Sequence, residues 1–138
     1  MDMIQTISAG GIVLNREGMV LVVAQRHNAW SLPKGKIDPG EDELTAAERE
    51  IYEESGVDHL VMQKKLGQYQ RYKLGVNGQD DQGELKTLHF YLFTTDQMEL
   101  KPIDPHNPEA RWVNKGDVPA MLTHPKDREF YESVMGEF

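Results

Sequence analysis

The segment Gly35–Val57, GKIDPGEDELTAAEREIYEESGV, contains the strongest helix signal in the chain. A helix is predicted from Glu43 to Ser55, because Asp42 is placed to cap its N-terminus and Gly56 stands just past its end. Apolar residues repeat along one side of this helix, which is therefore expected to pack against a sheet. They are Leu44, Ala47 and Ile51.

Three glutamates border the apolar stripe: Glu50, Glu53 and Glu54. At about 100° per residue they lie within roughly 100° of one helix face. Like charges at this spacing repel, and the repulsion grows near the interior as the dielectric falls. A divalent cation would compensate, and carboxylate oxygens suit Mg²⁺ or Mn²⁺. The alternative interpretation is a solvated acidic face in which Arg49 neutralises a neighbour.

The preceding segment, Trp30 to Gly40, is predicted to be a stiff loop that presents main-chain carbonyls to a cation. The residues responsible are Pro33, Gly35, Pro39 and Gly40. The two glycines also have the G-x4-G spacing of a P-loop. Glu41 and Asp42 stand where that motif requires Lys and Ser or Thr, so phosphate is not cradled in the Walker manner.

The segment resembles the Nudix box, G-x5-E-x7-R-E-U-x-E-E-x-G-U, in which U is a bulky aliphatic residue. The defined positions are all filled, by Gly35, Glu41, Arg49, Glu50, Ile51, Glu53, Glu54, Gly56 and Val57. This resemblance implies a single Nudix hydrolase domain over residues 1–138, with an α/β/α sandwich around a central mixed sheet. It also implies metal-dependent hydrolysis of the pyrophosphate bond in a nucleoside diphosphate linked to another group.

Roles follow from the resemblance by position. Glu50, Glu53 and Glu54 match the catalytic, metal-binding carboxylates, and the carbonyl of Gly35 matches a backbone ligand. Glu41 and Arg49 match residues that hold the loop and the helix together. One glutamate serves as general base in family members, often at the place of Glu50 or outside the box. Family members often carry a late acidic ligand or base, for which the candidate is Glu109, in competition with Glu84, Asp96 and Glu99.

Hydrophobic patterning predicts strands before and after this helix, and a mixed sheet with helices packed on it. A first strand is expected over 7–15, broken by Gly10-Gly11, and a polar loop over 75–84. A last helix opens at Pro125. The other predicted strands cover 19–25, 57–66, 67–74, 86–94 and 110–114.

The approach to the box, Trp30–Gly35, resembles that of dinucleoside polyphosphate hydrolases of the family. Lys34 and Lys86 are the preferred phosphate contacts among the basic residues, which also include Arg26, Lys36, Arg71 and Lys73. Three tyrosines are candidates for stacking on a base, with ordinary packing as the alternative for each. They are Tyr69, Tyr72 and Tyr91.

Composition narrows the partners. The net charge of −8 argues against broad nucleic-acid binding, so a small phosphorylated nucleotide is expected and DNA is not. Absence of cysteine excludes disulfides and thiolate sites and fits a cytoplasmic protein. The longest apolar run, 19–24, is too short to span a membrane. A monomer or a homodimer is expected.

The resemblance favours a dinucleoside polyphosphate, such as diadenosine tetraphosphate, as substrate. A nucleoside triphosphate, 5′-triphosphorylated RNA and a diphosphoinositol phosphate are the alternatives within the family. A non-catalytic nucleotide-binding sensor is the alternative from another class, and the intact carboxylates argue against it.

Overall fold

Within the described residues 3–24, 28–75, 79–106 and 109–138, the computed structural model has seven strands in one sheet. The strands are β1 (Ile4–Leu14), β2 (Val20–Ala24), β3 (Trp30–Ser31), β4 (Lys34–Lys36), β5 (Val61–Leu74), β6 (Asp80–Thr94) and β7 (Ala110–Val113). The helices are α1 (Glu43–Ser55), α2 (Val118–Met121) and α3 (Pro125–Val134), with short 3₁₀ helices η2 (Lys115–Asp117) and η3 (Met135–Glu137).

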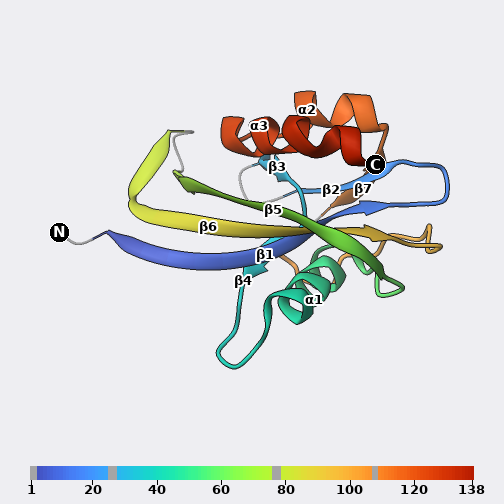
Figure 1. Ribbon diagram of the computed structural model, residues 1–138, viewed down its shortest axis with the longest axis horizontal. Helices are drawn as coiled ribbons and strands as arrows, with labels where there is room; N and C mark the ends of the chain where they lie inside the picture. Colours follow the sequence, from blue (N-terminus) through green and yellow to red (C-terminus); the bar gives the residue numbers. More distant parts are fainter. Residues whose placement is uncertain (1–2, 25–27, 76–78, 107–108) are drawn as a thin grey trace.

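The sheet is mixed, as predicted. Its main order is β3-β2-β1-β6-β5, while β4 pairs with β1 and β7 pairs with β2 (Figure 1). The long central strands β1 and β6 run parallel, from Ile4 opposite Glu84 to Leu14 opposite Thr94. The remaining pairs are antiparallel. The middle of β1, residues 8–10, therefore lies between β4 and β6.

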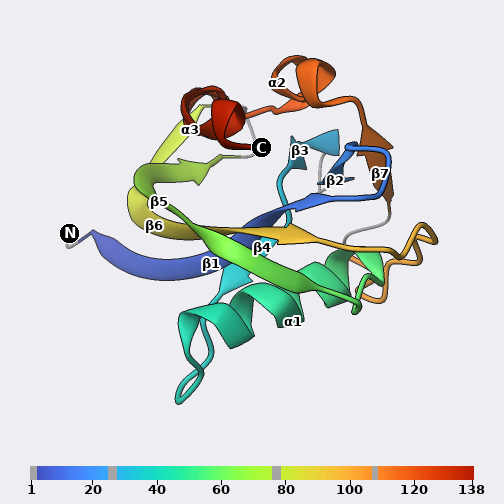
Figure 2. The ribbon, with the colours of Figure 1, turned by 45° about the vertical axis from the view of Figure 1, so that its right-hand side comes forward.

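Helices cover both faces of the sheet, which confirms the predicted α/β/α sandwich. Figure 2 shows α1 on one side and α2 and α3 on the other. Alternating residues of β6 enter two separate cores: Leu88 and Phe90 lie in the core beneath α2 and α3, and Phe93 lies in the core beneath α1. Both faces of this strand are thus covered over these residues.

The predicted break in β1 at Gly10-Gly11 is wrong, because the strand continues through both glycines. Each glycine instead permits a close approach. A Cβ atom on Gly10 would lie 2.2 Å from the carbonyl oxygen of Pro33, and one on Gly11 would lie 2.6 Å from the ring of Phe93. The glycines therefore admit β4 and the core aromatic ring at the middle of the strand.

Three further boundaries differ from the sequence prediction. The strands expected at 57–66 and 67–74 form one strand, β5, whose pairing with β6 has three register shifts, one of them at Gly67, where φ is +143°. Residues 80–84 belong to β6 and not to the predicted loop, of which residues 76–78 lie outside the described residues. Short strands β3 and β4 interrupt the loop predicted over 30–40.

Of the helices that the structure describes, none is long and apolar enough to cross a membrane.

Candidate active site

Helix α1 begins and ends where the sequence predicts. A carboxylate oxygen of Asp42 accepts the main-chain N–H of Thr45 at 2.7 Å. Gly56 adopts a left-handed conformation with φ of +80°, and its N–H donates to the carbonyl of Tyr52. The apolar side of the helix packs on β1, with Ala47 and Ile51 fully buried. This packing places the glutamates of the helix beside β4.

The structure brings Glu50, Glu54 and Gly35 together. Glu54 is 4% exposed, and its Oε1 accepts the main-chain N–H of Lys34 at 2.9 Å. A Cβ atom on Gly35 would lie 2.1 Å from the carboxyl carbon of Glu50, so only glycine allows the β4 backbone to approach this carboxylate. Glu53 lies at the edge of the group, with its side chain 37% exposed.

Arg49 connects the loop before α1 to these carboxylates. Its Nε and one terminal nitrogen donate to the two carboxylate oxygens of Glu41, at 2.8 and 2.9 Å. The other terminal nitrogen donates to Glu50 at 2.8 Å and to Glu53 at 3.2 Å. A further bond to the carbonyl of Lys36 ties the loop to the helix. The hydrogen bond from Arg49 lowers the pKa of Glu41 to about 2.

The two inner carboxylates have raised pKa values. Burial raises the pKa of Glu54 to about 8, and the neighbouring charge of Glu50 adds to this effect. Burial is also the main cause of the raised pKa of Glu50. A buried pair of carboxylates is costly unless positive charge compensates it. The site therefore has a deficit of positive charge.

These residues fit a hard divalent cation in donor chemistry. Carboxylate oxygens are the ligands that Mg²⁺ and Mn²⁺ prefer, and the deficit of positive charge is one that a cation would remove. Among the described residues, no three acidic or histidine side chains are close enough together to form a metal-binding group. Instead, Arg49 binds Glu50 and Glu53, and the N–H of Lys34 binds Glu54.

The lysines expected to contact phosphate lie close to each other. Burial, followed by repulsion from Arg71, lowers the pKa of Lys34. Burial, followed by repulsion from Lys34, lowers the pKa of Lys86 to about 8. The ammonium group of Lys86 lies 3.5 Å from Glu84. Arg26, another phosphate candidate, is outside the described residues.

The tyrosines are placed differently from the prediction of base stacking. The ring of Tyr69 stacks on Phe130 at 4.6 Å and on Phe90 at 5.8 Å, so it belongs to the core. Tyr91 packs on the α1 side and donates its hydroxyl to Glu43 at 3.0 Å. These contacts engage both rings or their hydroxyls within the protein, and a stacking role for either residue stays a prediction.

Tyr72 also lies away from the lysines. It pairs with Leu85 on β6, whereas the preceding residue, Arg71, pairs with Lys86. Because successive residues of a strand point to opposite faces, Tyr72 projects from the face opposite to that of Lys86. The structure thus groups the predicted phosphate contacts without the predicted aromatic platform.

The side chain of Glu109 forms its ion pair with Arg111 and not with a glutamate of the box. It precedes β7 and pairs with Arg111 at 2.5 Å, and both side chains are about half exposed. The acidic residue that approaches Glu54 from a late loop is Asp104, whose charge contributes to the raised pKa of Glu54. The N–H of Asp104 donates to the carbonyl of Glu53 at 2.9 Å. Sequence reasoning missed Asp104 because only this docking of the loop on α1 reveals it.

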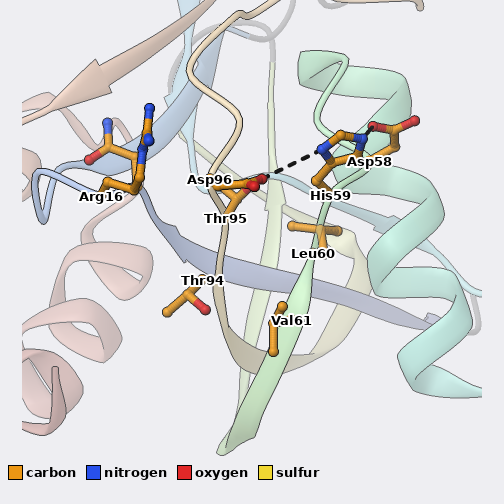
Figure 3. A pocket seen from close by; sticks show the side chains of 9 residues that line it. Arg16, Asp58, His59, Leu60, Val61, Thr94, Thr95 and Asp96 are labelled. Carbon is orange, nitrogen blue, oxygen red and sulfur yellow. Dashed lines mark ion pairs between the residues drawn. The ribbon is translucent and has the colours of Figure 1, made fainter.

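A pocket of about 730 Å³ opens at the other end of the sheet, where β1 and β6 end. Figure 3 shows His59 between Asp58 and Asp96, and the ring nitrogens lie 3.6 and 3.5 Å from the two carboxylates. The other lining residues include Arg16 and Val61, and no glutamate of the box reaches this pocket. It is therefore separate from the group around Glu54.

Comparison with known proteins agrees with this geometry. A family model described as the NUDIX domain matches residues 5–134. An RNA pyrophosphohydrolase of Erythrobacter litoralis is 35% identical over 150 residues, which cover 94% of this chain and 88% of the relative. The MutT protein of Methanosarcina mazei superposes with a TM-score of 0.75 at 23% identity, covering 99% of this chain and 97% of that one. An Ap4A hydrolase of C. elegans superposes with a TM-score of 0.74 at 17% identity, covering 94% and 96%.

Proposed function

The chain belongs to the Nudix family of pyrophosphohydrolases, and from this premise we propose that it removes pyrophosphate from the 5′-triphosphorylated end of RNA. One observation carries the proposal: the carboxylates of Glu50 and Glu54 lie against β4, at Gly35 and at the N–H of Lys34 respectively, and the cationic side chains of Lys34 and Lys86 belong to the same part of the sheet. This arrangement suits a substrate that brings several phosphates together.

In this proposal the carboxylates of Glu53 and Glu54, with the carbonyl of Gly35, would hold Mg²⁺ or Mn²⁺. Such a cation would neutralise phosphate oxygens and lower the pKa of a water molecule. Glu50 would accept a proton from water, because burial raises the pKa of this carboxylate while the bond from Arg49 orients it. Lys34 and Lys86 bind the phosphate oxygens.

The RNA substrate is supported by two observations. The relatives of 27–35% identity that carry the name RNA pyrophosphohydrolase cover most of this chain. In addition, Tyr69 and Tyr91 are engaged in packing, which removes two of the aromatic groups expected to bind the second base of a dinucleoside polyphosphate. A substrate held mainly by its phosphates fits such a site better.

A dinucleoside polyphosphate is the second candidate. The sequence approach Trp30–Gly35 favours it, and so does the fold that the chain shares with an Ap4A hydrolase of C. elegans. Both candidates present a chain of at least three phosphates attached to a 5′ oxygen, so the same carboxylates and lysines would serve either.

The test compares kcat/KM, with Mg²⁺ present, for 5′-triphosphorylated RNA, diadenosine tetraphosphate, ATP and a diphosphoinositol phosphate. We expect the RNA to be the best substrate and to release pyrophosphate or two phosphates in succession. A preference for diadenosine tetraphosphate of about tenfold, or 1.4 kcal/mol, would assign the second candidate. Absence of turnover on the whole panel, with nucleotide binding retained, would indicate a sensor.

A further inference from the structure

A buried histidine, His124, stands at the start of helix α3. It occupies the N-cap position and is 4% exposed. Its Nδ1 accepts the main-chain N–H of Lys126 at 3.1 Å. A ring nitrogen that accepts a hydrogen bond carries no proton, so the neutral ring must hold its proton on Nε2. The cap of α3 therefore requires a neutral imidazole in one tautomer.

The other ring nitrogen faces the end of the hairpin formed by β5 and β6, which curls towards α3 in both views (Figures 1 and 2). Nε2 lies 3.4 Å from a carboxylate oxygen of Asp80 on β6. The carbonyl of Tyr72 on β5 also influences the ring, but it accepts a hydrogen bond from Arg71 at 3.2 Å. Buried Nε2 has no hydrogen-bond partner in the part of the chain that the structure describes. His124 thus lies between the helix and the hairpin, with one hydrogen bond made and one missing.

Charged groups from three elements act on the ring. Strand β5 contributes Arg71, β6 contributes Asp80, and α3 contributes Asp127 and Lys126. Burial, followed by repulsion from Arg71, lowers the pKa of His124, while the two carboxylates oppose this effect. Asp127 already pairs with Arg71 at 2.8 Å, and the side chain of Asp80 is 54% exposed. The neutral ring is therefore the form that the folded protein favours.

Protonation would change the partners of His124. An imidazolium carries N–H groups on both nitrogens, so Nδ1 could no longer accept the N–H of Lys126. The first turn of α3 would lose its cap, because two donors would then face each other. Nε2 would meanwhile gain an attraction to Asp80. A proton thus weakens the contact of His124 with the helix and strengthens its contact with the hairpin.

We propose that His124 is a pH-sensitive switch, which caps α3 when the ring is neutral and releases the first turn of the helix when the ring is protonated. This switch goes beyond the proposed function and does not depend on the substrate. Its effect reaches the core through Asp127, which lies in the same turn and accepts hydrogen bonds from Tyr69 and Arg71. Release of the turn would loosen the contact between α3 and β5.

The direction of the pH dependence follows from the lowered pKa of His124. The folded chain binds fewer protons at this ring than the unfolded chain does, so the stabilisation by the neutral cap is lost as pH falls through about 6.5, the ordinary pKa of histidine. Burial also lowers the pKa of His89, which gives global stability the same pH dependence. The test must therefore observe α3 itself.

The experiment combines nuclear magnetic resonance of the His124 ring with hydrogen exchange at the amide of Lys126, at about pH 8 and about pH 5. At the higher pH we expect the ring proton on Nε2 and a protected amide. At the lower pH we expect a charged ring and a protection factor reduced at least about tenfold, because the cap has opened. Protection factors are compared because they correct for the intrinsic effect of pH on exchange.

Two variants separate the cap from the charge. His124→Asn keeps an oxygen that can cap the helix and does not titrate, so the amide of Lys126 should stay protected at both pH values. His124→Ala has no cap and should lose protection at both. The matched control is His59→Asn, at a histidine whose side chain is 69% exposed and which pairs with Asp58 and Asp96; this variant should behave as the wild type does.

Asp80→Asn tests the contact with the hairpin. Because it removes a carboxylate that favours the charged ring, the opening of α3 should move to lower pH. Asp81→Asn, at the next residue, should leave the opening unchanged. A proton on Nδ1 at the higher pH would overturn the switch. So would an equal loss of Lys126 protection in the wild type and in His124→Asn, or an unchanged amide while the ring titrates.

Discussion

The carboxylate of Glu54 is buried beside β4, where it accepts one hydrogen bond from the main-chain N–H of Lys34. Burial raises its pKa to about 8, so the folded protein disfavours the charged form in the absence of a cation. A glutamine at this position would still accept the same hydrogen bond. The charge of Glu54 is thus a cost to the fold that a metal-binding role would explain.

We predict that Glu54→Gln lowers kcat by roughly 100-fold or more, since loss of even a supporting partner costs metal sites 10–100-fold. The melting temperature of the metal-free protein should stay the same or rise, because a desolvated charge is removed. Glu48→Gln, on an exposed position of the same helix, is the control. Comparable kcat values for the two variants would contradict the assignment of Glu54.

Tyr69 shows how a residue that suggested substrate binding belongs to the core. We predict that Tyr69→Phe lowers the free energy of unfolding by about 1–2 kcal/mol, because buried Asp127 loses one of its donors. Chemical denaturation measures this change, with Tyr52→Phe, at a residue 41% exposed, as the control. A neutral Tyr69→Phe variant would show that the hydroxyl of Tyr69 does not support Asp127.

At the scale of elements, the C-terminal end of α1 organises the site. Its C-terminal residues receive the segment 101–104: the N–H of Lys101 donates to Ser55, and those of Ile103 and Asp104 donate to Glu53. This docking depends on Gly56, because a Cβ atom there would lie 2.4 Å from the carbonyl oxygen of Lys101. Gly56 therefore caps the helix, and its lack of a side chain also lets the 101–104 segment approach α1, which places Asp104 near Glu54.

Gly56→Ala and Gly40→Ala separate these two effects. Both glycines have φ of +80°, but a Cβ atom on Gly40 would have no neighbour within 4 Å among the described residues. Each substitution should cost roughly 1–2 kcal/mol for the left-handed conformation. Gly56→Ala should cost about 1–3 kcal/mol more, and should lower kcat, because the 101–104 segment must move. Equal losses of stability in denaturant melts would contradict the docking argument.

Local signals explain which elements the sequence predicts well. Helix α1 was located to the residue because Asp42, the apolar stripe and Gly56 all lie within the helix or next to it. The extents of β5 and β6 were not predicted correctly, because hydrogen bonds between strands determine where each strand begins and ends. The residues that pair in this way lie far apart in the chain. Residues 80–84 are polar, as in a loop, yet pairing with β1 and β5 makes them part of β6.

The same distinction applies to the site. Glu50, Glu53 and Glu54 were found because one helix carries them at a recognisable spacing. The basic residues Lys34, Lys36, Arg71 and Lys86 were also named from the sequence, but their position on one face of the sheet was not predicted, because the sequence does not reveal the register of the strands that carry them. The predicted role of Lys34 and Lys86 remains a prediction, and the structure adds Asp104 to the candidate residues of the site.

At the scale of the whole molecule, charge is unevenly distributed. The chain carries a net charge of −8, and its box carboxylates form a buried acidic group beside β4. The basic side chains of Lys34, Lys36, Arg71 and Lys86 lie on the opposite face of the sheet. Lys34 projects to one face of the sheet, while the next residue, Gly35, lies against Glu50 on the other. A polyanion with a bound cation would complement both regions at once.

Metal binding should therefore stabilise the whole domain. The carboxylates of α1 border the core that joins this helix to the sheet. Relief of their repulsion should therefore raise the free energy of global unfolding and not only stabilise a local loop. A ligand that binds only the folded state adds RT ln(1 + [L]/Kd), or about 2.7 kcal/mol at 100 times Kd. We predict a rise in melting temperature with Mg²⁺ that saturates, and that Glu53→Gln and Glu54→Gln each reduce.

The control is the melting temperature measured with Ca²⁺ and with Na⁺ at equal ionic strength. Screening of the net charge would act equally in all variants, whereas binding at the site would not. A melting temperature unaffected by Mg²⁺ in an active enzyme would mean that the cation binds together with the substrate, whose phosphates would then supply the missing ligands.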